Sequence, residues 1–515
     1  MLEDSLFSYY KPLRNKLRKV PLWESLGVIR AYMQYLQFSQ SLPQDVQVIR
    51  EYLQANDIEK RRWMAEWNLA TLAREIILNA QDIEPNQFLS SLKKWDYLAD
   101  SINKLKTLEG KISQLYLNQT NILSELRRIF FLESPWQIQK PQSSMMFRYF
   151  SIYSDENIDF IVQNKYGLSI KDIYTIGMLL LRVYINNLII YYPPQIEVEE
   201  INKEKLDKFL KYFAEDISNF KKIIANSNKI DENFLYQFNP LRYYPIIRCT
   251  NMGKEALICP IPTFLFWRLT GGVYYDLVKE KDFDNIYGKA FENYINEVLE
   301  KTNLRNLRIY RDEEYYPRPG IPKKTVDFIV SDNKELLFIE CKAKRLSIDS
   351  QILIDINEKA DKDYSILAEG IFQLYKTLDD YLNNLYTSCK YNNQSIYPLI
   401  LTLENWFMSG HNDIGVNNLV KEKVINLFRE NKLSLELLEK YPYSIMCIEE
   451  FEIAIQAMQQ TSFKSFIETK ILDKEKSTWP FYSYTNNYCK EHSVVIKELF
   501  DDNYIKKIFP ENFTL

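Results

Sequence analysis

The stretch from residue 325 to 345 constrains the fold of this chain most, because charged residues interrupt apolar runs there. Residues 326–330 and 336–341 are rich in β-branched and aromatic side chains, a composition typical of strands. Residues 331–334 between them read Ser-Asp-Asn-Lys, which is typical of a turn. The stretch therefore predicts a β-hairpin whose strands carry Asp327, Glu340 and Lys342 among sheet-core residues.

The turn sets the register of this hairpin. A two-residue turn at Asn333 and Lys334 places Asp327 directly opposite Glu340, with Cβ atoms about 4.5–5.5 Å apart. Side chains alternate along a strand, so Lys342 lies on the same face as Glu340. Two like charges this close destabilise a sheet unless a positive charge neutralises them. We therefore expect a divalent cation between the two acids.

Composition limits the class of protein. The 515 residues, 46% of them apolar, predict several domains with large cores. Six cysteines without a CxxC pair favour neither a disulfide framework nor a zinc site. We found no signal-peptide core and no uninterrupted apolar stretch of about 18 residues, so we expect a cytoplasmic protein without a membrane span. The net charge of −4 argues against a dedicated high-affinity nucleic-acid coat, but not against an enzyme that contacts a few phosphates.

Residues 1–235 show helical periodicity, as in Trp23, Leu26 and Ile29. Ser169 and Asp172 have the spacing of a capping box that opens a further helix. We expect a large all-α region here that senses, binds DNA or binds a partner. Prolines interrupt the periodicity within residues 236–282, which we expect to be a connector.

Beyond residue 282 the pattern alternates between helix and strand, which predicts an α/β core, a mixed sheet flanked by helices. The expected elements are a helix at 284–301, a strand at 304–316, a loop at 317–322, the hairpin, a helix at 365–385, and strands at 396–403 and 443–448, each followed by a helix.

Four Glu-x-Lys triplets occur in the chain, beginning at residues 109, 340, 430 and 468. Only Glu340 follows a continuous apolar strand and has an aspartate at hairpin register. It also lies between helices that carry Glu292 before it and Gln373 after it. The ordered set is therefore far more specific than the triplet alone.

This set resembles the PD-(D/E)xK nuclease superfamily, the restriction-endonuclease-like fold. The matching segments are Gly288-Lys-Ala-Phe-Glu292, Val326-Asp327, Ile339-Glu340-Cys341-Lys342 and Gly370-Ile-Phe-Gln373-Leu-Tyr375, the last similar to a RecB-type glutamine motif. The resemblance covers about residues 283–403, extending at most to 470, and implies a nuclease domain at 283–515 with a helical C-terminal extension. Val326 stands where the family often has proline.

The resemblance implies a Mg²⁺ or Mn²⁺ ion held by Asp327, Glu340 and the backbone carbonyl of Cys341. Glu292 would reach this ion directly or through water, or bind a second ion. These acids supply the hard oxygen ligands that Mg²⁺ prefers.

The remaining implied roles concern the phosphate and the attacking water. Lys342 would orient the water and stabilise the pentavalent state, and whether it also acts as the base stays open. Gln373 would hold Lys342 or the scissile phosphate. Lys344 and Arg345 would contact further phosphates.

The expected function is metal-dependent hydrolysis of DNA phosphodiester bonds, by an endonuclease rather than an exonuclease. The resemblance implies a prokaryotic restriction or anti-phage effector that acts as a homodimer or with a separate NTPase or sensor. One alternative is an RNase on the same fold. Another is a nucleic-acid-binding or scaffold protein with a vestigial site. The plainest alternative is that Asp327 and Glu340 are exposed strand-end acids paired with lysines.

Overall fold

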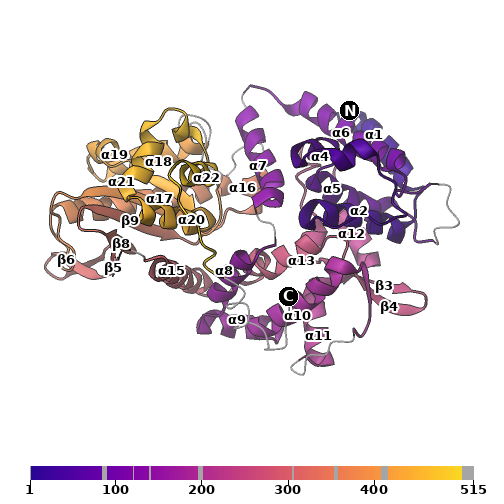
Figure 1. Cartoon of the computed structure of the whole chain (residues 1–515), viewed down its shortest axis with the longest axis horizontal. Helices are drawn as coiled ribbons and strands as arrows, with labels where there is room; N and C mark the ends of the chain where they lie inside the picture. The colour runs from indigo at the N-terminus through magenta and orange to yellow at the C-terminus, as the bar shows by residue number, and fades with distance from the viewer. Residues whose placement is uncertain are drawn as a thin grey trace. The chain divides into compact units, whose positions relative to one another are not determined.

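The computed structural model describes residues 2–83, 90–119, 121–138, 141–194, 201–303, 305, 307–352, 358–406 and 416–500. The chain forms two compact units (Figure 1). Unit 1 holds the described residues of Met1–Phe150 and Glu156–Glu280, and unit 2 those of Ser151–Asp155 and Lys281–Asp501. Among the described residues, no helix is both long and apolar enough to cross a membrane.

Unit 1 is mainly helical. Its α-helices are α1 Leu2–Leu17, α2 Leu22–Phe38, α3 Arg50–Gln54, α4 Asp57–Trp63, α5 Glu66–Asn79, α6 Trp95–Tyr116, α7 Ile122–Ile138, α8 Ser143–Tyr153, α9 Glu156–Tyr166, α10 Ile170–Asn186, α11 Lys203–Phe213, α12 Ile217–Ser227, α13 Pro262–Leu269 and α14 Tyr274–Leu277. The predicted capping box is confirmed, since Ser169 and Asp172 bond each other's backbone N–H at the start of α10.

A four-stranded sheet corrects the expectation of an all-α N-terminal region. Its strands are β1 Ile189–Tyr191, β2 Ala214–Asp216, β3 Ile246–Asn251 and β4 Lys254–Ile258, in the order β1-β4-β3-β2. Met252 and Gly253 both have positive φ, 50° and 73°, which matches the tight turn of a two-residue hairpin. Strands of three residues carry too little alternation to be recognised from sequence.

Residues 236–282 are also more than a connector. They form β3, β4 and α13, and every residue of α13 is buried. Asn239 donates a hydrogen bond to the carbonyl of Ala70 in α5 at 2.9 Å. The segment therefore belongs to the core of unit 1, although its prolines favour a linker by sequence.

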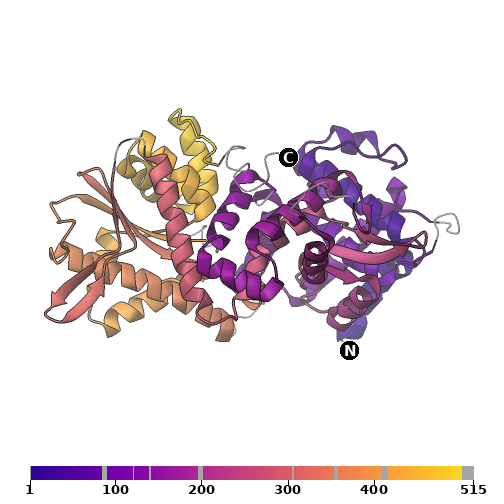
Figure 2. The same cartoon turned by 90° about the horizontal axis from the view of Figure 1, so that it is seen from below.

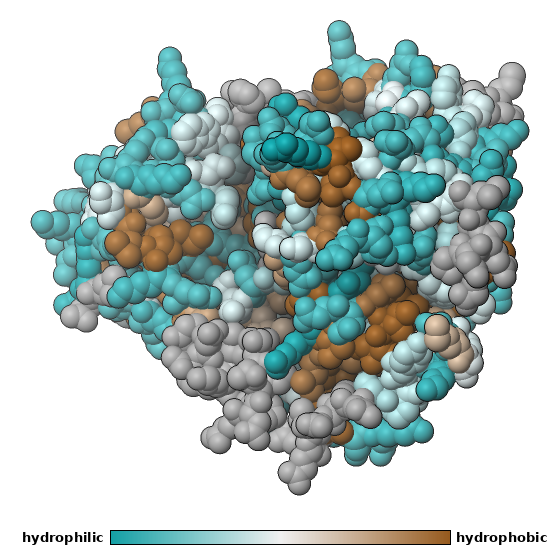
Figure 3. All heavy atoms as spheres, turned by 45° about the vertical axis from the view of Figure 1, so that its right-hand side comes forward, coloured by the Kyte–Doolittle hydropathy of each residue, from teal (hydrophilic) through white to brown (hydrophobic). Residues whose placement is uncertain are grey.

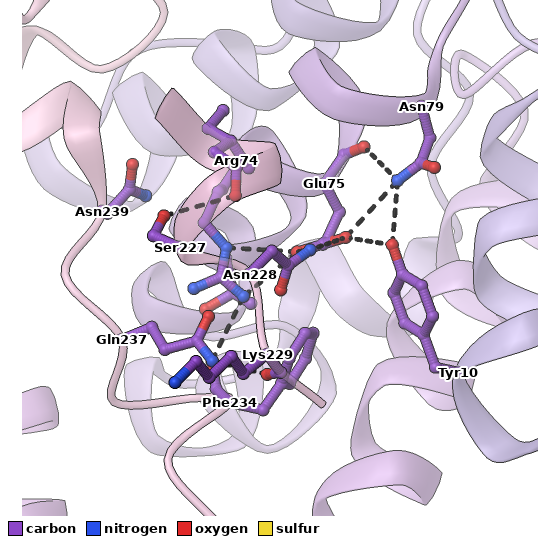
Figure 4. A network of polar contacts seen from close by, with 12 residues as sticks. Tyr10, Arg74, Glu75, Asn79, Ser227, Asn228, Lys229, Phe234, Gln237 and Asn239 are labelled. Atoms are coloured by element: carbon purple, nitrogen blue, oxygen red, sulfur yellow. Dashed lines mark hydrogen bonds and ion pairs between the residues drawn. The ribbon is translucent and has the colours of Figure 1, made fainter. Parts of the chain in front are cut away.

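A buried polar network around Glu75 joins distant parts of unit 1 (Figure 4). Glu75 of α5 is fully buried and accepts hydrogen bonds from Tyr10 of α1 at 2.7 Å and from Asn228 at 3.2 Å. Arg74 donates to Glu75 at 3.1 Å and to the carbonyl of Phe234 at 3.2 Å. These hydrogen bonds give the buried carboxylate of Glu75 the partners that a buried charge needs.

The surface of the molecule mixes hydrophilic side chains with separate hydrophobic patches on the face drawn in Figure 3. Exposed large apolar residues include Trp63, which is 44% exposed, and Met252, which is 84% exposed. Trp63 is not isolated, because its ring lies against those of Tyr52 and Trp95.

Unit 2 is a mixed α/β structure. Its helices are α15 Phe283–Thr302, α16 Ile348–Ile352, α17 Glu358–Leu382, α18 Val416–Glu430, α19 Glu436–Lys440, α20 Ile448–Gln460, α21 Phe463–Leu472 and α22 Phe481–Glu491. Its strands are β5 Arg308–Arg311, β6 Glu314–Arg318, β7 Ile321–Lys324, β8 Phe328–Ser331, β9 Glu335–Lys342, β10 Ser395–Thr402 and β11 Ser444–Cys447.

The main sheet of unit 2 has the strand order β11-β10-β9-β8-β5. The pairs β5/β8 and β8/β9 are antiparallel, whereas β9/β10 and β10/β11 are parallel. The predicted mixed sheet is confirmed. Because β9 has a neighbour on either side, residues 336–340 are all buried, as central strands require.

The expected strand at 304–316 differs from the structure. β5 joins the main sheet, whereas β6 pairs with β7 in a separate two-stranded sheet whose tip projects from unit 2 in Figures 1 and 2. The expected loop at 317–322 therefore holds the turn of this hairpin. Pro317 and Pro322 are tolerated in its strands because an edge strand can lack a backbone donor.

Candidate active site

The hairpin at β8 and β9 has the register that the sequence predicts. Ile329 lies opposite Phe338, and Phe328 lies opposite Ile339. Asp327 immediately precedes β8, so the same register brings it opposite Glu340 at the open end of the strand pair. Asn333 has φ of 72° at the turn, a conformation that asparagine tolerates better than most residues.

Asp327 bridges the two strands where their backbone pairing ends. Its Oδ2 accepts a hydrogen bond from the backbone N–H of Cys341 at 2.7 Å. The N–H and C=O of a paired strand residue point to the same side, so the carbonyl of Cys341 is directed towards the Asp327 side of β9. A carboxylate and a backbone carbonyl therefore converge at this point.

Glu340 and Lys342 form an ion pair on the face of the sheet that Asp327 shares by register. The Nζ of Lys342 lies 2.7 Å from Oε1 of Glu340, and the side chains are 23% and 10% exposed. With 10% of its side chain exposed, Glu340 is not a solvated strand-end acid, although it is paired with a lysine. A buried ion pair carries a desolvation penalty, so function is a more natural reason for these residues than stability.

The acids are held at raised pKa values. Burial, followed by the nearby carboxyl groups of Glu340 and Glu292, raises the pKa of Asp327 to about 8. Burial also raises the pKa of Glu340, although Lys342 acts in the opposite direction. Neighbouring carboxyl groups that raise each other's pKa are frequent in catalytic and metal sites.

Lys342 is a cation in this site. Burial lowers its pKa, but the carboxylates of Glu340 and Asp327 outweigh burial and the net pKa is raised. A lysine with a raised pKa is a poor base at neutral pH. The raised pKa therefore favours an electrostatic role for Lys342 over proton abstraction in this conformation.

Glu292 on α15 is linked to a cation that sequence reasoning missed. Lys289, one turn earlier on α15, places its Nζ 2.6 Å from Oε2 of Glu292 and 3.5 Å from Oδ1 of Asp312. The signal was the i,i+3 spacing of Lys289 and Glu292, which brings side chains together on a helix. Lys289 partly neutralises the acidic side of the site.

α17 approaches the site through a glycine. A Cβ atom at Gly370 would lie 3.3 Å from Cδ of Lys342 and closer still to its Cε. Gln373, three residues later and hence on the same helix face, is exposed to solvent. Lys342 instead donates a hydrogen bond to Glu340. The glutamine lies near the lysine along the helix but does not hold it here.

The two expected phosphate contacts differ from each other. Arg345 is buried and forms an ion pair with Glu404. Its guanidinium is therefore engaged inside the protein, and the expected phosphate contact is not supported. Lys344 is half-buried. Arg345 differs from Lys344 because it lies next to Glu404, a residue distant in sequence.

The donor set fits a hard divalent cation. Asp327, Glu340 and the Cys341 carbonyl offer oxygen ligands, which Mg²⁺ and Mn²⁺ prefer. Two neighbouring acids with raised pKa values gain most from a positive charge between them. As the side chains lie, no group of three or more His, Cys, Asp or Glu residues in the described part of the chain is arranged to hold a metal ion. Glu292, engaged by Lys289, would have to move to become a third ligand.

Comparisons with protein-family models, with curated proteins and with solved structures gave no match for this chain.

Proposed function

We propose that this chain is a metal-dependent nuclease that hydrolyses phosphodiester bonds of DNA, with the residues at the open end of β8 and β9 as its active site. The observation that carries the proposal is the convergence of the half-buried Asp327 and the buried Glu340 with the cationic Lys342. A structural ion pair needs only one of these acids. The order of the residues along the chain, from Glu292 to Gln373, resembles PD-(D/E)xK nucleases and supports the same proposal.

Asp327, Glu340 and the Cys341 carbonyl would hold Mg²⁺ or Mn²⁺, with Glu292 as a further direct or water-mediated ligand. Bound there, the metal supplies a water molecule of lowered pKa and neutralises negative charge on the phosphoryl oxygens. The backbone N–H of Cys341 donates a hydrogen bond to Asp327 and keeps that carboxylate oriented.

Lys342 contributes a fixed positive charge beside the scissile phosphate. Its proton stays on Nζ at neutral pH because Glu340 raises its pKa, so it donates hydrogen bonds to phosphoryl oxygens or to the attacking water. Charge placed where the transition state becomes negative lowers the barrier. Gln373, exposed on the same face of α17 as Gly370, is positioned for the phosphate, and Lys344 for the next phosphate along the strand.

The biological setting follows from the resemblance. We propose an endonuclease of a prokaryotic restriction or anti-phage system in the cytoplasm, with DNA as its substrate. The helical unit 1 would sense or recruit the target. The active assembly would include a second copy of this chain or a separate NTPase or sensor.

The test is incubation of the purified full chain with plasmid, linear duplex, single-stranded DNA and tRNA, with Mg²⁺, Mn²⁺ or EDTA. We expect cleavage of DNA in the presence of metal and none in EDTA. Asp327→Ala, Glu340→Ala and Lys342→Ala should each abolish cleavage while circular dichroism stays unchanged. Cleavage of tRNA alone would favour an RNase, and full activity in any of the three variants would refute the assignment.

A further inference from the structure

A cavity of about 350 Å³ lies in unit 1, well away in sequence from the candidate active site. It is lined by Arg62, Trp63, Met64, Trp95, Ala99 and Asn103, which come from the end of α4 and the first turns of α6. Small-molecule sites range from about 300 to 1,000 Å³. The cavity is therefore large enough for one flat ring system.

Two tryptophans form its aromatic wall. The ring centroids of Trp63 and Trp95 are 5.8 Å apart at an angle of 44°. Trp95 is 8% exposed and Trp63 44%, so Trp63 is the ring with free surface. The fully buried Tyr52 contacts both rings. Its ring centroid lies 6.4 Å from that of Trp63 and 5.1 Å from that of Trp95. An aromatic core alone does not require a tryptophan with this much open surface.

The backbone around Trp63 is held in place from two directions. The Nζ of Lys106 donates hydrogen bonds to the carbonyls of Arg62 at 2.6 Å and Trp63 at 3.1 Å. On the other side, Arg61 forms an ion pair with the fully buried Glu66 at 2.9 Å. A wall that is rigid before binding loses little entropy when a ligand arrives.

The polar residues of the cavity determine which ligand fits. Arg62 and Asn103 are both exposed, so a cation and an amide stand beside the indole rings. An organic cation would fit tryptophan faces but is repelled by Arg62. The nearby acid Asp100 is already neutralised by Lys16 and Lys104, each at 2.8 Å. The combination favours a flat aromatic ligand that carries a negative charge.

We propose that this cavity binds a nucleobase together with its adjoining phosphate. The base stacks on Trp63, the amide of Asn103 bonds the edge of the base, and the guanidinium of Arg62 pairs with the phosphate. Asparagine amides are suited to the edge of adenine, and stacking on an aromatic side chain tolerates any base. This site goes beyond the proposed function, because it binds nucleic acid or a nucleotide without cleaving it.

The test uses the full chain in EDTA, where hydrolysis does not interfere. The probe is a short oligothymidylate with a single central 2-aminopurine, whose fluorescence falls when the base stacks on an indole. We expect quenching when the probe binds the wild type. In Trp63→Ala the affinity should fall about tenfold, since one stacked base contributes about that much or more, and the quenching should disappear. Arg62→Gln should weaken binding and lower the salt dependence by about one phosphate contact.

Two variants serve as matched controls. Tyr191→Ala removes an aromatic ring that is 44% exposed, as Trp63 is, and Arg18→Ala removes an exposed cation from unit 1. Both should bind like the wild type. Competition with adenosine monophosphate identifies the source of the ligand. If the site takes a free nucleotide, adenosine monophosphate displaces the probe at concentrations similar to that of the probe. If the site takes a strand, the probe resists displacement.

Absence of quenching, or wild-type binding by both Trp63→Ala and Arg62→Gln, would overturn the proposal. Arg62 is exposed, so Arg62→Gln leaves the fold intact even if Trp63→Ala does not. Because the binding assay contains no metal, a negative result would not contradict the proposed metal-dependent cleavage. A chain that does not cleave DNA could likewise still bind the probe.

Discussion

Gly370 of α17 lies so close to Lys342 of β9 that any Cβ atom at position 370 would collide with the lysine side chain. The glycine thus defines the space through which Lys342 reaches Glu340. A helix interior normally disfavours glycine by about 1 kcal/mol relative to alanine. Its presence here is explained by the close approach rather than by any need for a special backbone conformation.

The first prediction concerns this contact. Gly370→Ala should displace Lys342 and reduce cleavage at least about tenfold, as expected when a catalytic charge is misplaced by about 1 Å. Gly110→Ala in α6 is the matched control, because no atom lies within 4 Å of its added methyl group. That control should keep full activity and equal or greater stability. Unchanged cleavage in Gly370→Ala would show that the lysine position is not critical.

The second prediction concerns pH and metal. The pKa of Asp327 is raised in the folded chain, to about 8, so the folded state binds its proton more tightly than the unfolded state. The stability linked to Asp327 is therefore fully present below pH of about 4, the unfolded pKa, and is lost as pH rises through about 8. In EDTA, the melting temperature should fall across this window.

Asp327→Asn should reduce this fall, because the amide does not ionise. Mg²⁺ should stabilise the wild type more at pH 8.5 than at pH 5.5, since protons compete with the metal for the same carboxylates. Differential scanning fluorimetry at several pH values, with Mg²⁺ or EDTA, measures both effects. An equal Mg²⁺ effect at both pH values would contradict a site at these acids.

The third prediction concerns Lys289. Its ion pair with Glu292 opposes metal binding by that acid, so Lys289→Ala should strengthen Mg²⁺ binding severalfold in titration calorimetry. The pair is half exposed at the lysine, so stability should change by less than about 1 kcal/mol. Lys208→Ala, which breaks the similar surface pair with Glu204, should leave metal affinity unchanged. Equal affinities in both variants would place Glu292 outside the metal site.

The fourth prediction separates Lys344 from Arg345. The ion pair of Arg345 with Glu404 is only 6% and 18% exposed at the two side chains, so Arg345→Ala should cost up to about 3–5 kcal/mol of stability. Lys344→Ala should keep the stability but weaken DNA binding and reduce its salt dependence by about one phosphate contact. Urea denaturation and fluorescence anisotropy measure the two quantities. An Arg345→Ala variant that stays stable and loses DNA affinity would restore the original expectation.

The sequence alone determined the features that depend on local periodicity. Turn residues at 331–334 and alternating side chains predicted the hairpin, its register and the pairing of Asp327 with Glu340. The helical stripe of α15 likewise placed Glu292, and the side chains that form this stripe are buried as expected. Short-range geometry repeats along a chain with a fixed period, so these features follow from neighbouring residues.

Only the tertiary structure decided the features that join distant segments. The ion pair of Arg345 with Glu404, the approach of Gly370 to Lys342 and the cavity between Trp63 and Trp95 each bring together residues from different elements. So does the sheet of unit 1, whose shortest strands have three residues. Burial and the partners of a charge are set by packing between elements, and packing has no period that a sequence reveals.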